Sequence, residues 1–287
     1  MSLLRDHMSR DMVRAGLASR TRTQYIAAIR HMTEFLGRPP EQLVPDDIRA
    51  WDDEMFRRGN GPDWLDVHVA ALKFLYRKTL SRPEMVSFLI YARHPQRLPI
   101  VLSLDEVFRL LAAFRERRYH AFYALIFDTG LRVSEAAELK AGDLDHACGV
   151  IHVRHGKGGK ERQVKLGERL YQLLRSYWRE VRMKASHSEP LSGDSVLFAC
   201  ATGTRINLDG ARKALRLAAQ EAGITKQITP HTLRHSYATQ QMEVGTDLRV
   251  VQAQLGHADI RSTQIYLHVS TRLIRQAPSP LDALPPH

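Results

Sequence analysis

Residues 229–269 decide the fold of the C-terminal part of this chain, and they read TPHTLRHSYATQQMEVGTDLRVVQAQLGHADIRSTQIYLHV. The pair Thr229-Pro230 predicts the start of a helix, because threonine is a good N-terminal cap and proline fits the first helical position. Gly245 is expected to end this helix, since glycine readily adopts the left-handed conformation that follows a last helical turn. The stretch therefore opens with one helix that carries several polar side chains.

Two further helical segments are expected in the same stretch. Thr246 is expected to cap a second helix that runs through Gln254, and Gly256 ends that helix. His257 follows directly, and Tyr266 lies nine residues further on, in the third segment. A histidine and a tyrosine are therefore both placed next to helix ends.

The polar side chains of these segments suit chemistry on a phosphate. His231 and Arg234 are three residues apart and so share one face of the first helix. An arginine fork binds two anionic oxygens at once, a histidine donates or shuttles a proton, and the hydroxyl of Tyr266 can attack. Together with His257, these residues are candidates for a site that acts on a phosphate group.

The composition describes an ordinary globular chain with an excess of positive charge. Its 287 residues include 42 Lys and Arg against 31 Asp and Glu, which gives a formal charge of +11. This excess indicates a polyanionic partner, above all nucleic acid; the alternative is a basic surface that only aids solubility. Cys148 and Cys200 stand far apart, so neither a disulfide framework nor a cysteine-based metal site is indicated. No apolar run approaches a membrane span and no signal peptide is evident, so a reducing cytoplasm is the expected location.

The first eighty residues are expected to form four helices. Apolar side chains recur at helical spacing over residues 3–17, 21–36, 45–55 and 64–80. Arginines and lysines are scattered over the polar faces of these segments. This pattern suits either a plain solvated helix bundle or a helical clamp on DNA, and nothing inside the segment decides between them.

Residues 81–103 resemble an interdomain linker, since they contain three prolines and four arginines or histidines that could follow a phosphate backbone. Ser103 and Glu106 then have the spacing of a capping box and predict a new helix. We therefore expect a first domain at residues 1–80, a linker at 81–103 and a second domain at 104–287. The tail of the second domain begins at about residue 267.

The second domain contains an arginine that could bind an anion and a predicted β-hairpin. Arg132 lies in an apolar neighbourhood with Glu135 three residues later, so it is paired with that carboxylate, held ready for an anion, or both. Residues 150–154 and 162–166 alternate as strands do, and the glycine-rich segment 155–161 joins them. This segment is not a phosphate-binding P-loop, because the leading glycine of that motif is absent. By itself, its tip is most simply an exposed turn.

Five sequence motifs resemble, in identity and in order, the motif set of the tyrosine recombinases (phage integrases), and the bacterial Xer-type members are the most similar. The motifs are TGLRVSE at residues 129–135, GKG at 156–158, His231-x-x-Arg234, LGH at 255–257, and Tyr266. They span about residues 103–270, and the segment 97–103 resembles the family as well. The resemblance implies a mainly α-helical fold with a small antiparallel β-sheet, in which a helical core-binding domain precedes an α+β catalytic domain.

The resemblance also implies a role for each motif residue. Tyr266 would be the nucleophile that attacks the scissile phosphodiester and leaves a 3′-phosphotyrosyl bond and a free 5′-hydroxyl. The other implied roles are charge stabilisation by Arg132 and Arg234, proton donation to the leaving oxygen by Lys157, assistance by His231 and His257, and orientation of Arg132 by Glu135. No cofactor and no metal is expected, because the phosphotyrosyl linkage conserves the bond energy.

A pair of histidines and one tyrosine in this region also have structural interpretations. His231 and His235 form an H-x-x-x-H pair that could suggest zinc. The second position, however, is Thr232 rather than the glutamate of a metalloprotease helix, so we discount zinc. Tyr237 is expected to be a core residue.

The resemblance implies a site-specific recombinase that cleaves and rejoins double-stranded DNA as a tetrameric synaptic complex, in a bacterial-type cytoplasm at the nucleoid. Two alternatives share the ancestry: a DNA-binding protein that has lost strand transfer, and a topoisomerase. The intact set of six catalytic residues, Arg132, Lys157, His231, Arg234, His257 and Tyr266, favours the recombinase, and the chain's compact size argues against the topoisomerase. The DNA target, the direction of the reaction and the involvement of accessory DNA-binding proteins stay open.

The last sixteen residues, 272–287, combine four apolar side chains with four prolines. Such a segment cannot bury its apolar side chains within itself, so it must dock elsewhere or stay disordered. By the resemblance, it would dock on a neighbouring protomer; docking on its own domain is the alternative.

Overall fold

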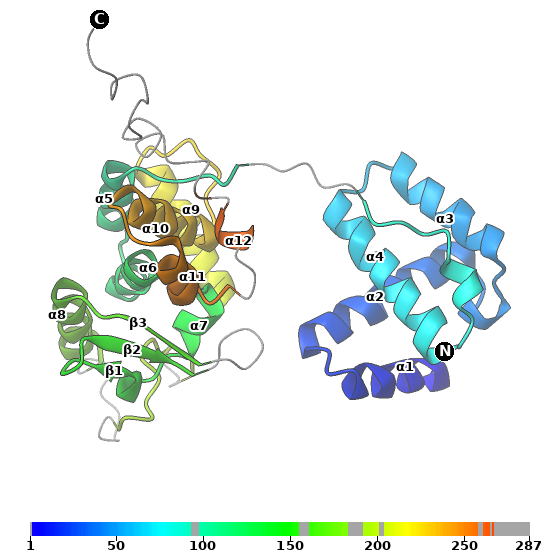
Figure 1. Cartoon of the computed structure of the whole chain (residues 1–287), viewed down its shortest axis with the longest axis horizontal. Coiled ribbons are helices and arrows are strands. Elements are labelled where there is room, and N and C mark those ends of the chain that lie inside the picture. The colour runs from blue at the N-terminus through cyan, green and yellow to red at the C-terminus, as the bar shows by residue number, and fades with distance from the viewer. Residues whose placement is uncertain are drawn as a thin grey trace, which may run out of the picture. The chain divides into compact units, whose positions relative to one another are not determined.

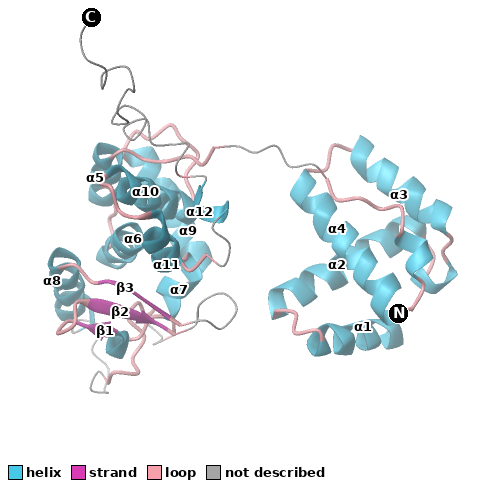
Figure 2. Cartoon of the chain, in the orientation of Figure 1, coloured by secondary structure: helices cyan, strands magenta, loops and turns pink. Residues whose placement is uncertain are grey.

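A computed structural model describes residues 2–92, 98–154, 161–182, 192–200, 204–257, 261–264 and 266. The chain divides into two compact units, residues 1–96 and 97–287 (Figure 1). Helices dominate both units, and the strands belong to the second (Figure 2). The expected fold class, mainly α-helical with a small antiparallel sheet, is confirmed. Among the described residues, no helix is both long enough and apolar enough to cross a membrane.

Over residues 2–92, the first unit is a bundle of four α-helices, as expected. They are α1 (Ser2–Arg14), α2 (Ser19–Leu36), α3 (Pro45–Arg57) and α4 (Pro62–Phe74), and α4 continues into a π-helical turn, Leu75–Thr79. Pro45 begins α3 because a first-turn residue needs no intrahelical N–H bond. The core is closed by side chains from different helices, among them Met12, Met32, Trp51 and Tyr76, each fully buried.

The first unit extends beyond residue 80, where the sequence placed its end. Pro83 begins a short 3₁₀ turn, Pro83–Val86, rather than an extended linker. This turn buries Met85 and Val86 in the core of the first unit, and Leu89 follows them there. At the other end, Leu102 is buried in the core of the second unit, so the connecting segment is shorter than the expected 81–103. Proline marked a change of direction here, not the end of a core.

The second unit is built around α6 (Arg117–Thr129), whose residues 121–126 are all buried. Around it lie α5 (Leu104–Ala112), α7 (Val133–Glu138), α8 (Glu168–Tyr177), α9 (Leu208–Glu221) and α10 (Pro230–Glu243). Helix α8 continues into a π-helical turn, Trp178–Arg182. After α10 the chain forms α11 (Leu248–Leu255) and α12 (Arg261–Gln264). Helices α5, α8 and α10 pack directly on α6. The expected capping box begins α5: Ser103 N–H donates to the Glu106 carboxylate at 2.7 Å, and Glu106 N–H donates to Ser103 Oγ at 3.1 Å.

A three-stranded antiparallel sheet lies beside these helices, in the order β1 (Leu144–Asp145), β2 (Val150–Val153) and β3 (Arg162–Lys165). Ile151 lies opposite Val164, and both are buried. The alternation of the sequence correctly predicted β2 and β3. Strand β1 was not predicted, because two residues are too few to show an alternation of apolar and polar side chains.

The start of α11 differs from the expectation. Asp247, not Thr246, is the N-terminal cap, since its carboxylate accepts a hydrogen bond from Arg249 N–H at 2.7 Å. The Thr246 hydroxyl instead donates to the Gln241 side chain at 3.0 Å. Both residue types are good caps, so local preference did not decide between the two neighbours.

Candidate active site

Helix α10 carries one buried cation into the interior of the second unit. Pro230 begins the helix, and Thr229 N–H donates to Thr232 Oγ1 at 3.1 Å across its first turn. One turn further along, Arg234 is only 3% exposed. Burial lowers the pKa of Arg234 to about 10, and the nearby charge of Arg132 adds to this shift. The guanidinium therefore remains protonated at neutral pH.

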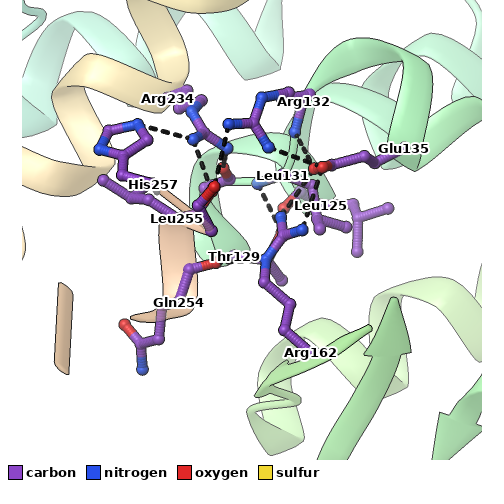
Figure 3. A network of polar contacts seen from close by, with 12 residues as sticks. Leu125, Thr129, Leu131, Arg132, Glu135, Arg162, Arg234, Gln254, Leu255 and His257 are labelled. Carbon is purple, nitrogen blue, oxygen red and sulfur yellow. Dashed lines mark hydrogen bonds and ion pairs between the residues drawn. The ribbon is translucent and has the colours of Figure 1, made fainter. Parts of the chain in front are cut away.

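Backbone carbonyls hold Arg234 in place. Its Nη1 donates to Gly130 O at 2.6 Å and its Nη2 to Leu255 O at 2.7 Å (Figure 3). Gly130 adopts φ +65°, and a Cβ at this position would overlap the ring of Tyr237. A glycine is thus needed where α6 ends, both for the backbone conformation and for the space.

The second arginine of the site, Arg132, and a third arginine, Arg162, both bind the buried carboxylate of Glu135. Arg132 donates to Glu135 Oε1 through Nη1 and to Oε2 through its backbone N–H, both at 2.8 Å. Arg162 reaches the same carboxylate from β3, at 3.0 Å to Oε1 and 2.7 Å to Oε2. Burial alone would raise the pKa of Glu135, but the hydrogen bonds and charge of Arg162, and then Arg132, lower it below its usual range. Glu135 is therefore an anion held between two cations.

The last turn of α11 presents three successive carbonyl oxygens to three different arginines. Gln254 O accepts from Arg162 Nε at 2.8 Å. Leu255 O accepts from Arg234, and Gly256 O accepts from Arg132 Nη2 at 3.3 Å. A helix C-terminus has unpaired carbonyls and a partial negative charge, which suits this use. Figure 3 shows the resulting network, in which α11 and Glu135 fix the guanidinium groups.

His257 completes the surroundings of Arg234. Its Nε2 lies 2.9 Å from Arg234 Nη2, and its Nδ1 lies 2.9 Å from Thr263 Oγ1. Burial lowers the pKa of His257 to about 4, and the charges of Arg234 and Arg132 add to this shift. Because an arginine can only donate, Nε2 accepts, and the neutral ring carries its proton on Nδ1 toward Thr263.

Tyr266 reaches the same helix, α10, from the chain after α12. Its side chain is 1% exposed, and its hydroxyl lies 2.9 Å from Nδ1 of His235. Burial raises the pKa of Tyr266, while the charges of Arg234 and Arg132 act in the opposite direction. The ring of His231 lies one turn before His235, 6.4 Å between ring centroids. Burial lowers the pKa of His231, and Arg234 and Arg132 lower it further, so this ring is neutral too.

The structure thus brings most of the expected residues together. Arg132, Glu135, Arg234 and His257 form one connected network, and Tyr266 and His231 interact electrostatically with its two arginines. Lys157 lies outside the described residues. Helix α12 ends at Gln264, two residues before Tyr266, which occupies a turn. Tyr237 is a core residue, as expected.

Two residues of this site were not among the expected ones. Arg162 opens the second strand of the hairpin, where a strand pattern gives no sign of a partner 27 residues away. His235 was considered only as a partner of His231 for zinc. Its spacing of four residues from His231 was the available signal, because it places both rings on one face of α10. In the described parts of the chain, no group of three or more His, Cys, Asp or Glu side chains could hold a metal ion.

The arrangement can bind and polarise an anion beside a hydroxyl nucleophile. Two arginines are fixed before any ligand arrives, so that little reorganisation is needed when charge develops on a bound phosphate. The three histidines are neutral, because each of their pKa values is lowered, so each ring has one nitrogen that bears a lone pair.

Comparison with known proteins covers nearly the whole chain. The model of the phage integrase family matches residues 101–272, and that of the phage integrase N-terminal SAM-like domain matches residues 4–84. A putative integrase/recombinase of Sinorhizobium fredii is 34% identical over 295 aligned positions, which cover 99% of this chain and 90% of the relative. A tyrosine recombinase XerD of Oceanobacillus iheyensis is 34% identical and covers 90% of each chain. In a crystal structure of a lambda integrase tetramer bound to a Holliday junction, the protein shares the fold, with a TM-score of 0.72, 18% identity and coverage of 92% of this chain and 76% of that chain.

Proposed function

Because the chain belongs to the tyrosine recombinase (phage integrase) family and is a site-specific DNA recombinase, we propose that Tyr266 is its nucleophile. The observation that carries this assignment is the position of Tyr266: the residue is buried, its hydroxyl lies 2.9 Å from His235 of α10, and the charges of Arg234 and Arg132 act on it. An unperturbed tyrosine titrates near pH 10, so two cations beside it favour the ionisation that attack requires.

Arg132 and Arg234 would hold the non-bridging oxygens of the scissile phosphate. An arginine has five N–H groups. Within the described residues, the hydrogen bonds of Arg234 use Nη1 once and Nη2 twice, which leaves a second Nη1–H and the Nε–H for a ligand. Glu135 and Arg162 would keep Arg132 in a matching orientation. Two forks in fixed positions suit a pentacovalent transition state with charge on its oxygens.

The proposed reaction proceeds in two steps. Tyr266 attacks the phosphorus and forms a 3′-phosphotyrosyl bond, and the 5′-oxygen leaves with a proton that Lys157 supplies. His231 and His257 assist by hydrogen bonding and proton management, His257 through its contact with Arg234. A 5′-hydroxyl of the partner strand then attacks the phosphotyrosyl bond and restores the tyrosine. The roles of Lys157 and of the two histidines rest on the matching motifs of this sequence.

The chain binds DNA. We place residues 1–96 as the core-binding unit that clamps the duplex, and the second unit as the catalytic one. The working form would be a tetramer on two DNA duplexes in the cytoplasm, associated with the nucleoid, with accessory proteins at some targets. The tetrameric assembly of the lambda integrase neighbour supports this proposal.

A Tyr266→Phe variant tests the nucleophile. With a nicked substrate that traps cleaved intermediates, the wild-type chain should form a covalent protein–DNA adduct on the DNA that flanks its gene. The variant should form none while it binds the same DNA with nearly unchanged affinity, because only one hydroxyl is lost. Tyr171→Phe, on α8 outside the site, is the matched control and should form the adduct normally. An adduct with Tyr266→Phe would show that another residue attacks; no adduct with the wild-type chain would favour a protein that only binds DNA.

A further inference from the structure

His235 contacts the atom that the proposed function makes reactive. It lies on α10 directly after Arg234, and its ring is 5.7 Å from the ring of Tyr266 between centroids. Nδ1 of His235 and the Tyr266 hydroxyl are 2.9 Å apart, within normal hydrogen-bond distance. In the part of the chain that the structure describes, neither His231 nor His257 makes a hydrogen bond to this hydroxyl.

The surroundings of His235 keep its ring uncharged. The ionisable groups that face it are His231 and Arg234 on its own helix, His257 at the end of α11, and Tyr266. Burial lowers the pKa of His235 to about 4, and the proximity of His231 and Arg234 contributes. A neutral imidazole has one nitrogen with a free lone pair. With the ring proton on Nε2, Nδ1 accepts the hydrogen bond that the phenol donates.

We propose that His235 is a further catalytic residue, the base that receives the proton of Tyr266 when this tyrosine attacks the phosphate. This assignment rests on the proposed function of Tyr266. The geometry distinguishes His235 from His231, the motif residue one turn earlier. The ring of His231 lies beside the ring of His235, whereas His235 contacts the Tyr266 hydroxyl.

The proton and electron flow is complete. The Tyr266 O–H bond breaks, its proton moves to His235 Nδ1, and the tyrosine oxygen forms a bond to phosphorus. The P–O5′ bond breaks, and its electron pair stays on the 5′-oxygen, which takes a proton from the acid assigned to Lys157. In the joining step the 5′-hydroxyl attacks and returns that proton, the bond from tyrosine to phosphorus breaks, and Tyr266 regains its proton from His235.

Proton transfer during attack removes the difficulty of ionising a buried phenol in advance. As its oxygen bonds to phosphorus, the phenol becomes more acidic. The negative phosphate, in turn, makes the nearby imidazole more basic. A base within hydrogen-bond distance therefore matters most in the transition state, where general base catalysis is typically worth 10²–10⁴ in rate.

The test compares two substitutions and two nucleophiles. In His235→Asn, the amide oxygen can still accept a hydrogen bond from Tyr266 but cannot take a proton; His235→Ala removes both functions. We expect each variant to reduce the single-turnover cleavage rate by on the order of 10²–10⁴, with half-site binding unchanged. His120→Asn, a substitution on α6 outside the site, should leave the rate unchanged. A fluorinated tyrosine at position 266, whose phenol is more acidic, should shrink the defect of His235→Asn by about tenfold or more, because a better-ionised nucleophile depends less on a base.

Three outcomes would overturn the assignment. An equal defect with both nucleophiles would show that His235 acts only structurally. If the fluorinated tyrosine reduced the cleavage defect of a His231→Asn variant and not that of His235→Asn, the role of base would belong to His231. Faster cleavage by His235→Asn would show that the contact restrains the tyrosine. Mapping the adduct to a residue other than 266 would contradict the proposed nucleophile itself, so the two failures are distinguishable.

Discussion

Arg162 and Arg132 donate to both oxygens of one buried carboxylate, although they lie on different elements. Arg162 has a side chain that is 10% exposed, and it also holds the Gln254 carbonyl. One guanidinium therefore joins the hairpin strand β3, the helix end of α11 and the carboxylate that orients Arg132. We regard Arg162 as a positioning residue, since it acts on the phosphate site through Glu135 and α11.

Replacing Arg162 should damage both stability and cleavage. Arg162→Ala leaves Glu135 with one cation, and removing a partner from a buried ion pair typically costs about 3–5 kcal/mol. Arg162→Lys should restore the charge but not the two parallel hydrogen bonds, so cleavage should stay low. Urea unfolding and single-turnover cleavage measure the two effects.

The matched control for Arg162 is Arg205→Ala. Arg205 pairs with Glu138 at 2.8 Å, but both side chains are well exposed. Exposed pairs contribute about 0–1 kcal/mol, so this variant should unfold and cleave nearly as the wild type does. Normal cleavage by Arg162→Lys would show that charge alone suffices at this position.

At the scale of elements, the end of α11 acts as an anchor for the arginines. Its cap, Gly256, has φ +64°, and a Cβ there would meet Arg162 side-chain atoms at 3.1 Å. The preceding helix, α10, ends near Gly245, which has φ +85° and where an added Cβ would meet nothing within 4 Å. The two glycines share the backbone requirement but differ in what surrounds them.

A pair of alanine substitutions separates these two causes. Gly256→Ala and Gly245→Ala should each lose about 1–2 kcal/mol of stability, because an L-residue is strained in the left-handed region. Only Gly256→Ala should displace Arg162 and thereby slow cleavage beyond the effect of lower stability. Thermal unfolding and cleavage well below the transition provide the comparison. Equal cleavage rates for the two variants would contradict the anchoring role of α11.

At the scale of the whole molecule, each unit has a large core of its own, and a smaller cluster that contains Tyr237 and Tyr266 belongs to the second unit. The two units each bury their own apolar side chains, so each has the requirements of an independent folding unit. Residues 267–287 lie outside the described part of the chain. Their sequence, with Leu273 and Ile274 followed by proline-rich residues, remains the basis for expecting that they dock on a neighbouring protomer.

Truncation after Thr271 tests that expectation. The shortened chain should bind one half-site as the full chain does, since no motif residue is removed. Filling of the second half-site should become less cooperative and recombination should fall, because the proposed link between protomers is lost. Gel-shift titration on one and two half-sites measures the first effect, and a Leu273→Ser, Ile274→Ser double variant should reproduce it. A truncated chain that assembles and recombines like the full one would indicate docking in cis or none.

The sequence alone predicted the four helices of the first unit, the hairpin strands and the motif positions. These features depend on local spacing: a capping box at Ser103, alternation in β2 and β3, and glycines at helix ends. The resemblance of the short motifs to the tyrosine recombinases singled out the site residues one by one; those that the structure describes are Arg132, Glu135, His231, Arg234, His257 and Tyr266. Where two good caps stood side by side, as at Thr246 and Asp247, local preference could not choose.

Only the tertiary structure decided which of these residues touch. Arg132 reaches the Gly256 carbonyl across 124 positions of sequence, and Arg162 reaches Glu135 across 27. No periodicity encodes such pairings, because they depend on how α6, α10, α11 and β3 pack together. For the same reason, the pairing of His235 with Tyr266 could not be read from spacing: the helix fixes the direction of the histidine, but the fold brings the hydroxyl to it.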